Sequence, residues 1–112
     1  MDRLETAQPR PFGTAMTQAV AAEVADMMVG VVDHGTGTNA QIPGVRVAGK
    51  TGTAQTAPGK PADAWFVAFA PAESGDVAVA VVIEGAPNDG QISGGRLAAP
   101  VAKAVMNAIL NK

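Results

Sequence analysis

A chain of 112 residues is long enough for one small domain, and 47% apolar against 16% charged residues excludes a disordered polypeptide. The net charge of −2, without any basic run, argues against a nucleic-acid partner. The chain has no cysteine and one histidine, His34, so it offers no disulfide, no thiolate nucleophile and no Cys- or His-pair metal motif. No metal and no cofactor are therefore expected.

The N-terminal stretch, Met1–Gly13, is polar, contains two prolines and lacks the apolar core of a signal peptide. No later segment approaches the roughly 18–20 apolar residues that cross a membrane. We predict that residues 1–13 form a linker or extended arm and that residues 14–112 form the folded unit. Because a domain rarely starts with such an arm, we also expect the chain to begin inside a longer protein.

A helical pattern begins after Thr17, whose hydroxyl can accept a hydrogen bond from an unpaired backbone N–H. Apolar residues then recur at helical spacing and predict one buried face: Val20, Val24, Met27, Met28 and Val31. The two methionines are interpreted as core residues. Gly35 is expected to end the helix. The run Gly35–Asn39 is predicted as a flexible loop. It partly resembles a dinucleotide-binding motif, but that motif must follow a strand and this run follows a helix, so we do not predict dinucleotide binding.

Three strand-like runs follow, joined by short turns rich in Pro and Gly. Val45–Gln55 begins with alternating apolar residues, Ala64–Ala70 is almost entirely apolar, and Val77–Ile83 is rich in β-branched residues. We expect the second run to be buried on both faces, as central strands are. Strands connected by such short turns predict an antiparallel meander.

Residues Gly85–Gly94 are predicted as a loop, and a second helix runs from there to the C-terminus. Helical spacing predicts its buried face: Leu97, Val101, Val105, Ala108 and Ile109. Pro100 falls near its first turn, where a missing N–H is tolerated. The predicted fold class is α+β, with a three-stranded antiparallel meander packed against an N-terminal and a C-terminal helix.

Within the first strand, Lys50, Thr51, Gly52 and Thr53 combine one positive charge, two hydroxyls and a backbone without a Cβ. Such a set can hold an anionic group beside a polarised carbonyl. Residues Gly44–Thr51 also match the P-loop pattern G-x-x-x-x-G-K-[ST]. However, its variable residues read as a strand and no helix can begin after Lys50, so nucleotide binding is the weaker hypothesis. A third alternative is an ordinary edge strand whose lysine opposes aggregation.

Lys-Thr-Gly followed by Thr on a strand is also the third motif of the penicillin-recognising serine enzymes. The segments VAGKTGTAQ, AWFVAFAP, VAVAVVIEG and GGRLAAPVAKAV resemble the C-terminal part of the transpeptidase domain of a class B penicillin-binding protein, of actinobacterial type. The resemblance covers about Thr14 to the C-terminus. It implies peptidoglycan D,D-transpeptidation through a serine acyl-enzyme, in a parent protein that is extracytoplasmic and membrane-anchored.

The resemblance also implies a role for each residue of the motif. Lys50 would supply positive potential in the cleft and bond to the serine of the family's second motif. The hydroxyls of Thr51 and Thr53 would bind the carboxylate of a D-Ala-D-Ala stem peptide or of a β-lactam. Gly52 would let the backbone approach the ligand, and the Thr53 N–H would be one of two oxyanion-hole donors. The substrate would lie along this edge strand.

The family's S-x-x-K nucleophile and S-x-N motif do not occur in the chain, because Ser74 and Ser93 stand in SGDV and SGGR. We therefore predict that the chain alone does not catalyse acyl transfer and instead supplies the Lys-Thr-Gly strand to a transpeptidase. The alternative is a non-catalytic peptide-binding or scaffold module. Two strands that the family places beside Val77–Ile83 are also absent, so we expect this strand at an exposed edge, available for a homodimer or a domain swap.

Three further residues look family-like. We interpret Asp63 as the start of a strand, Trp65 as a core aromatic residue and Arg96 as a solvent-facing residue rather than as members of the site.

Overall fold

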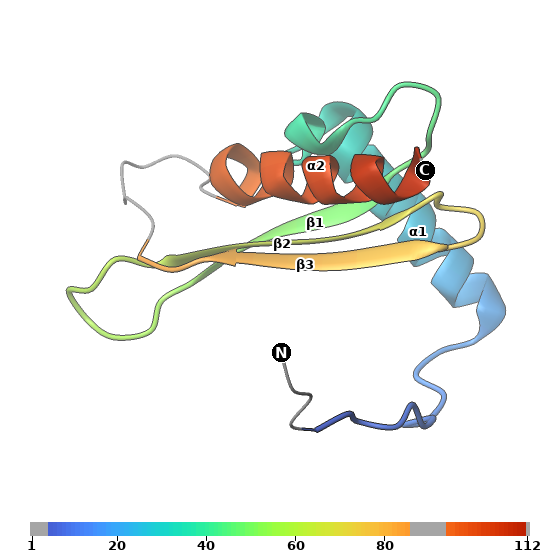
Figure 1. Ribbon diagram of the computed structural model, residues 1–112, viewed down its shortest axis with the longest axis horizontal. Helices are drawn as coiled ribbons and strands as arrows, with labels where there is room; N and C mark the ends of the chain where they lie inside the picture. Colours follow the sequence, from blue (N-terminus) through green and yellow to red (C-terminus); the bar gives the residue numbers. More distant parts are fainter. Residues whose placement is uncertain (1–4, 86–93, 112) are drawn as a thin grey trace.

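An antiparallel sheet forms the centre of the fold, and a helix from each half of the chain packs on it (Figure 1). The computed structural model describes residues 5–85 and 94–111. Its strands are β1 (Ala48–Ala54), β2 (Asp63–Ala70) and β3 (Val77–Ile83), in the order β1-β2-β3. Its helical elements are α1 (Gln18–His34), η1 (Thr38–Ala40), η2 (Gly94–Ala98) and α2 (Ala99–Leu110). The predicted α+β meander is confirmed.

The register of the strands places one row of side chains against the helices, because residues paired across strands share a face of the sheet. This row joins Thr51, Phe66 and Val81. Phe66 is fully buried at its centre. α1 packs against β1, and α2 packs against β2 and β3. Figure 1 shows α2 lying along the sheet, whereas α1 passes behind β1 and continues beyond it.

The expectation that the second strand is buried on both faces was wrong. Along β2, Phe66 and the alanines of its face are buried, whereas Trp65 and Val67 between them are 38% and 40% exposed. Because α2 covers only the face that carries Phe66, the other face of β2 stays open. β3 alternates in the same way between partly buried and exposed residues, and its outer edge has no partner strand within residues 5–85 and 94–111, as predicted.

The two ends of α1 follow the predicted signals. The Thr17 hydroxyl accepts the backbone N–H of Val20 at 3.2 Å. At the other end, Gly35 donates its N–H to the Val31 carbonyl at 3.1 Å and caps the helix. No helix in the described part of the chain is long and apolar enough to cross a membrane.

The predicted buried face of α1 was wrong, since Val24, Met28 and Val31 are only partly buried and the other two members are exposed. Val29 and Val32 are the buried residues of this helix, whereas Val20 and Met27 are 46% and 66% exposed. Met27 is therefore not a core residue. The first turns of α1 project past the sheet (Figure 1), which accounts for the exposure of Val20.

The predicted buried face of α2 was also wrong. α2 turns two alanines and one methionine to the core: Ala99, Ala102 and Met106. The predicted Val101, Val105 and Ile109 are 42%, 41% and 47% exposed. Alanine permits a close approach between helix and sheet, and this packing outweighs the greater hydrophobicity of the valine stripe.

β1 is shorter than the predicted strand Val45–Gln55. Val45 instead closes a turn, in which its N–H bonds to the Ile42 carbonyl at 3.1 Å and Gly44 adopts a φ of 78°. The predicted arm lies exposed and in no helix or strand where it is described, over residues 5–13. The predicted loop Gly85–Gly94 lies outside the described residues except at its two ends.

Candidate functional site

The residues of the Lys-Thr-Gly-Thr motif all lie on β1, an edge strand of the described sheet. Their cross-strand partners divide them between two faces. Thr51 pairs with Phe66 and faces the core, whereas Lys50 pairs with Val67 on the open face. Thr53 is exposed near the end of the strand. β1 therefore presents the motif's backbone at its outer edge and divides its side chains between the two faces.

The Lys50 side chain is exposed and folds back over its own strand. Its Nζ donates to the Thr51 carbonyl oxygen at 2.8 Å. Neither ion pair found in residues 5–85 and 94–111 involves Lys50. The Lys50 ammonium has three N–H donors and uses one of them on this carbonyl, so it can still donate hydrogen bonds to an incoming anion.

Thr51 is 9% exposed, and its hydroxyl is already hydrogen-bonded. The partner is the hydroxyl of Thr36, with 2.9 Å between the two Oγ1 atoms. A hydroxyl has one hydrogen and two lone pairs, so this bond leaves Thr51 with capacity for a second partner. The three side chains of the predicted set are therefore two exposed ones, of Lys50 and Thr53, and the buried hydroxyl of Thr51.

Two glycines at the site differ in whether the surrounding atoms leave room for a Cβ. A Cβ on Gly52 would lie 3.4 Å from the Trp65 Cβ, at the boundary of ordinary contact, so neighbouring side chains do not demand glycine there. A Cβ on Gly94 would overlap the Trp65 carbonyl oxygen and lie 3.1 Å from the Gly52 carbonyl oxygen. The start of η2 is therefore pressed against the backbone of the motif, which sequence reasoning had not recognised.

Sequence reasoning also missed the segment after α1. The predicted flexible loop, Gly35–Asn39, contains the start of η1, and the Asn39 amide donates to the Gly95 carbonyl at 2.9 Å. Together with the Thr36 bond to Thr51, this contact joins the segment to the motif. Spacing gives no signal for such contacts, because the partners lie 15 and 56 residues apart.

The other residues singled out in the sequence lie as follows. Asp63 begins β2, as predicted, and its carboxylate accepts the Gly85 N–H at 3.1 Å. Trp65 is 38% exposed on the open face, so its assignment to the core was wrong. Arg96 is exposed, Ser74 lies in the β2–β3 turn, and Ser93 lies outside the described residues.

The P-loop hypothesis fails on geometry. Lys50 lies inside β1, and the strand continues to Ala54, so no helix begins at Lys50 as a P-loop requires. No group of three or more His, Cys, Asp and Glu residues that could hold a metal ion occurs in the described part of the chain.

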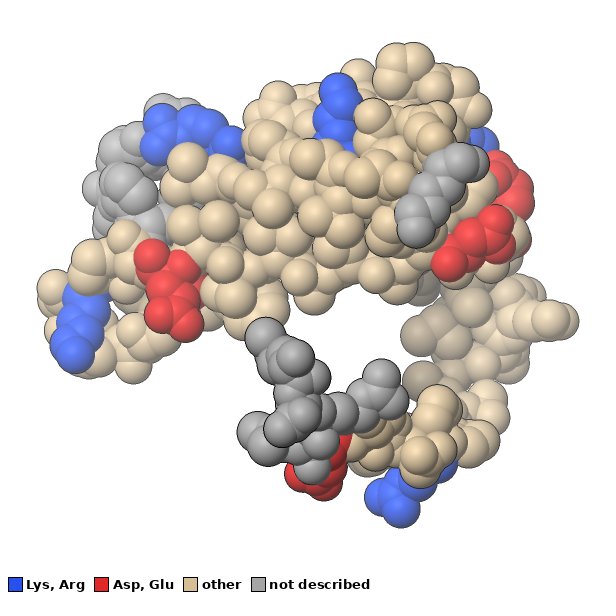
Figure 2. Space-filling view, viewed as in Figure 1, with Lys and Arg blue, Asp and Glu red and all other residues tan. Residues whose placement is uncertain are grey.

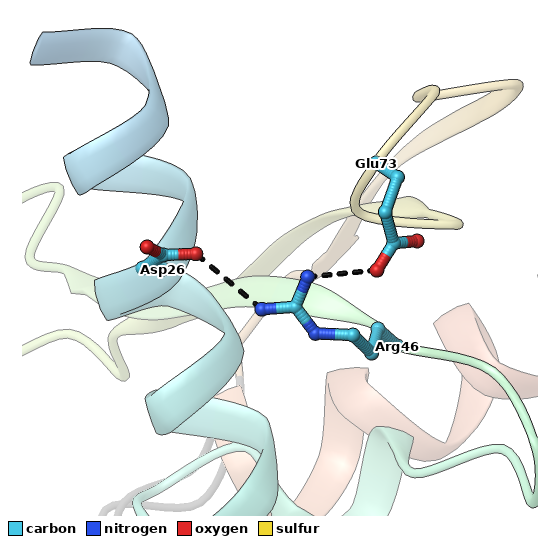
Figure 3. A network of polar contacts seen from close by, with 3 residues as sticks. All are labelled: Asp26, Arg46 and Glu73. Carbon is cyan, nitrogen blue, oxygen red and sulfur yellow. Dashed lines mark hydrogen bonds and ion pairs between the residues drawn. The ribbon is translucent and has the colours of Figure 1, made fainter. Parts of the chain in front are cut away.

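Arg46 ties the entry of β1 to two other elements (Figure 3). Its guanidinium donates to Glu73, in the β2–β3 turn, at 2.7 Å and to Asp26 of α1 at 3.3 Å. The backbone adds a third link, since the Ala72 N–H bonds to the Arg46 carbonyl at 2.8 Å. The two carboxylates raise the pKa of Arg46, Glu73 contributing most, and the hydrogen bond from Arg46 lowers the pKa of Glu73.

Replacing Glu73 with Gln is expected to flatten the acid dependence of stability. Because the pKa of Glu73 is lowered in the fold, the contact stabilises the protein above the unfolded pKa of about 4.3 and is lost as the pH falls through the lower folded pKa. In thermal unfolding at low salt, wild type should therefore lose more stability than E73Q between about pH 5 and pH 3. Parallel pH profiles for the two proteins would count against the contact.

The chain matches a known protein family over most of its length. The family described as penicillin binding protein transpeptidase domain matches residues 2–107. The chain is 44% identical over 99 residues to the peptidoglycan D,D-transpeptidase PbpA of Mycobacterium tuberculosis H37Rv, a match that covers 86% of this chain and 20% of PbpA.

Two solved structures share the fold. The D,D-transpeptidase domain of a peptidoglycan glycosyltransferase from Eggerthella lenta is similar with a TM-score of 0.76 and 40% identity, over 98% of this chain and 24% of that one. M. tuberculosis penicillin-binding protein A, solved as an imipenem acyl-enzyme complex, is similar with a TM-score of 0.71 and 42% identity, over 86% and 20%. This chain thus spans between a fifth and a quarter of the length of these relatives. Since the family match includes α1, all three described strands and most of α2, the chain belongs to the penicillin-binding protein transpeptidase domain family.

Proposed function

We propose that this chain forms the substrate-binding edge of a peptidoglycan D,D-transpeptidase. Lys50 and the hydroxyls of Thr51 and Thr53 bind the carboxylate of a D-Ala-D-Ala stem peptide or of a β-lactam, and the Thr53 N–H is an oxyanion-hole donor. The observation that carries this proposal is the position of the motif on β1, an edge strand of the described sheet with Lys50 and Thr53 exposed. An extended peptide can add to such an edge as a further strand.

The backbone of β1 supports the assignment of Thr53. The N–H and C=O of one residue in an antiparallel strand point to the same side, and the direction repeats every second residue. The Thr51 carbonyl receives the Lys50 ammonium at 2.8 Å, which a long side chain achieves most readily at the edge away from β2. We infer that Thr51 and Thr53 both direct their backbone groups to this edge, where a ligand carbonyl can reach the Thr53 N–H.

The chemical step needs a nucleophile, and neither serine of this chain stands in S-x-x-K. We propose that the nucleophile belongs to another part of an extracytoplasmic, membrane-anchored transpeptidase. The M. tuberculosis relative, solved as an acyl-enzyme complex with imipenem, supports this class of chemistry. The alternative of a peptide-binding module without catalysis predicts the same binding and no covalent product.

Binding by the motif can be tested on the chain itself. We expect N-acetyl-D-Ala-D-Ala to shift the backbone amide NMR signals of Lys50–Thr53 and to spare those of residues 5–13. Mg-ATP, which a P-loop would bind, should cause no shift at the same positions. A dipeptide that leaves these four signals unchanged at millimolar concentration would refute the proposed site.

The open edge of β3 suggests a second copy of this chain as a partner. Figure 2 shows that the side of the molecule over α2 and β3 carries few charged side chains. On the open face, Val67, Phe69, Ala78 and Ala80 line an apolar hollow of about 440 Å³ with Met28. We propose that two β3 strands pair in an antiparallel dimer, since an unpaired apolar edge favours strand addition.

Val82→Lys should abolish this dimer, because a lysine beside the edge opposes strand pairing. Val101→Lys is the matched control, since Val101 on α2 is 42% exposed and Val82 is 40% exposed. Light scattering after gel filtration is expected to give a dimer for wild type and V101K and a monomer for V82K. A monomeric wild type at high concentration would contradict the proposed dimer.

A further inference from the structure

A hydrogen bond joins the proposed ligand-binding strand to the segment that follows α1. It links the hydroxyl of Thr36, one residue past the helix cap, to the hydroxyl of Thr51 in β1, with 2.9 Å between the oxygens. Thr36 is exposed, whereas Thr51 is 9% exposed. The bond therefore joins an exposed residue to one that lies mostly inside the fold.

The chemistry of hydroxyl groups determines which oxygen must donate when an anion is bound. Each hydroxyl has a single hydrogen, and a carboxylate can only accept. For Thr51 to bind a carboxylate, its hydrogen must point at the ligand, so it cannot also be donated to Thr36. Thr36 must then be the donor within the pair, and its lone pairs remain free to accept from water.

The segment around Thr36 is held in place by η2, which is distant in sequence, and by the end of α1. A Cβ on Gly95 would overlap the Thr36 carbonyl oxygen and lie 3.6 Å from the Thr51 Cγ2, so η2 packs directly against both threonines. The Asn39 amide donates to the Gly95 carbonyl at 2.9 Å, and the Gly37 N–H bonds to the Val31 carbonyl at 2.9 Å. Thr36 is therefore fixed relative to β1 by contacts on both sides of it.

We propose that Thr36 is a positioning residue for the ligand-binding strand. It donates to the Thr51 Oγ1, holds that side chain in one rotamer and leaves the Thr51 hydrogen directed at a ligand carboxylate. A hydroxyl that accepts one bond while donating another is also the stronger donor, because hydrogen bonds in a chain polarise one another. This inference rests on the proposed function, since it assigns Thr51 a carboxylate as its second partner.

The test measures selectivity for a carboxylate rather than binding alone. NMR titrations of the full chain would compare N-acetyl-D-Ala-D-Ala with its C-terminal amide, which keeps the peptide and removes the charge. In wild type the acid should bind about tenfold or more tightly than the amide, as expected for a hydrogen bond to a charged group. Thr36→Val should reduce this ratio about tenfold, and Thr36→Ser, which keeps the hydroxyl, should restore it to within about twofold.

Further results decide between the possible outcomes. Thr51→Val should lower the ratio at least as far as T36V, because it removes the contact with the carboxylate as well as the contact with Thr36, and the double variant should lose no more than T51V. If wild type fails to prefer the acid, the proposed function is wrong and this inference fails with it. If wild type prefers the acid and T36V keeps the full ratio, only the role of Thr36 is refuted. If T36V does not fold, Thr36→Ala takes its place in the titrations. Loss of folding in both variants would show that Thr36 has a structural role and would overturn the proposal.

Discussion

Replacing Phe66 with Ala is expected to lower the free energy of unfolding by about 3–5 kcal/mol, as is typical for a fully buried phenylalanine. Phe66 is 0% exposed, and its ring occupies space that two glycines leave open. A Cβ on Gly49 would lie 2.5 Å from the Phe66 Cζ, and one on Gly37 would lie 3.1 Å from its Cε1. The ring thus joins β2 to β1 and to the segment after α1, so a small domain with about 5–15 kcal/mol of stability would lose much of it.

Urea unfolding followed by fluorescence can measure this effect, since Trp65 is the one tryptophan in the chain. Val67→Ala is the matched control, because Val67 follows Phe66 on β2 but is 40% exposed on the open face. It should cost about 0.5 kcal/mol, as exposed substitutions usually do. Similar losses for F66A and V67A would show that the core is not confined to the face of β2 that carries Phe66.

Replacing Lys50 with Met is expected to slow penicillin acylation about 10- to 100-fold, which corresponds to the 1.5–3 kcal/mol of one hydrogen bond to a charged group. The reporter is a chimera in which this chain replaces the matching segment of M. tuberculosis PbpA, the relative solved as an acyl-enzyme complex. Met keeps the length of the side chain and removes the ammonium. Because Lys50 is exposed, thermal stability should change little.

Lys60→Met in the same chimera is the control, since Lys60 is also exposed and lies in the turn between β1 and β2. Penicillin should acylate this variant at the same rate as the unmodified chimera. If penicillin acylates K50M as fast as K60M, Lys50 makes no contact with the carboxylate of the ligand, and the proposed ligand-binding role of the motif is wrong.

The order and type of the elements could be predicted because each carries its own local signal. Thr17 caps the first helix as expected, and the strand Val77–Ile83 has the predicted limits. These features depend on neighbouring residues in the chain, which a sequence shows directly. The α+β meander follows from them, because short turns between strands leave few other arrangements.

The buried faces of the helices could not be predicted in the same way. Spacing favoured Val101, Val105 and Ile109 on α2, yet the helix buries its alanines and Met106. Apolar spacing identifies a candidate face but does not show whether small or large residues meet the sheet. In a chain with 47% apolar residues, both faces of a helix can look like core.

The candidate site was predictable in part. Lys50, Thr51, Gly52 and Thr53 could be singled out because they are consecutive and carry a recognisable set of groups. Their supporting residues could not. Thr36, Asn39 and Gly95 contact the motif or one another only after the chain has folded, and nothing in their local sequence predicts these contacts.

Labelling by a fluorescent penicillin is the most direct test of the central claim that β1 supplies the ligand-binding edge of a transpeptidase. Three polypeptides would be compared: this chain, M. tuberculosis PbpA and the chimera between them. We expect no covalent labelling of the chain alone and labelling of the chimera within about tenfold of the rate for PbpA, because the motif and its supporting segment are transferred together. Covalent labelling of the isolated chain, or a folded chimera that does not label, would contradict the account.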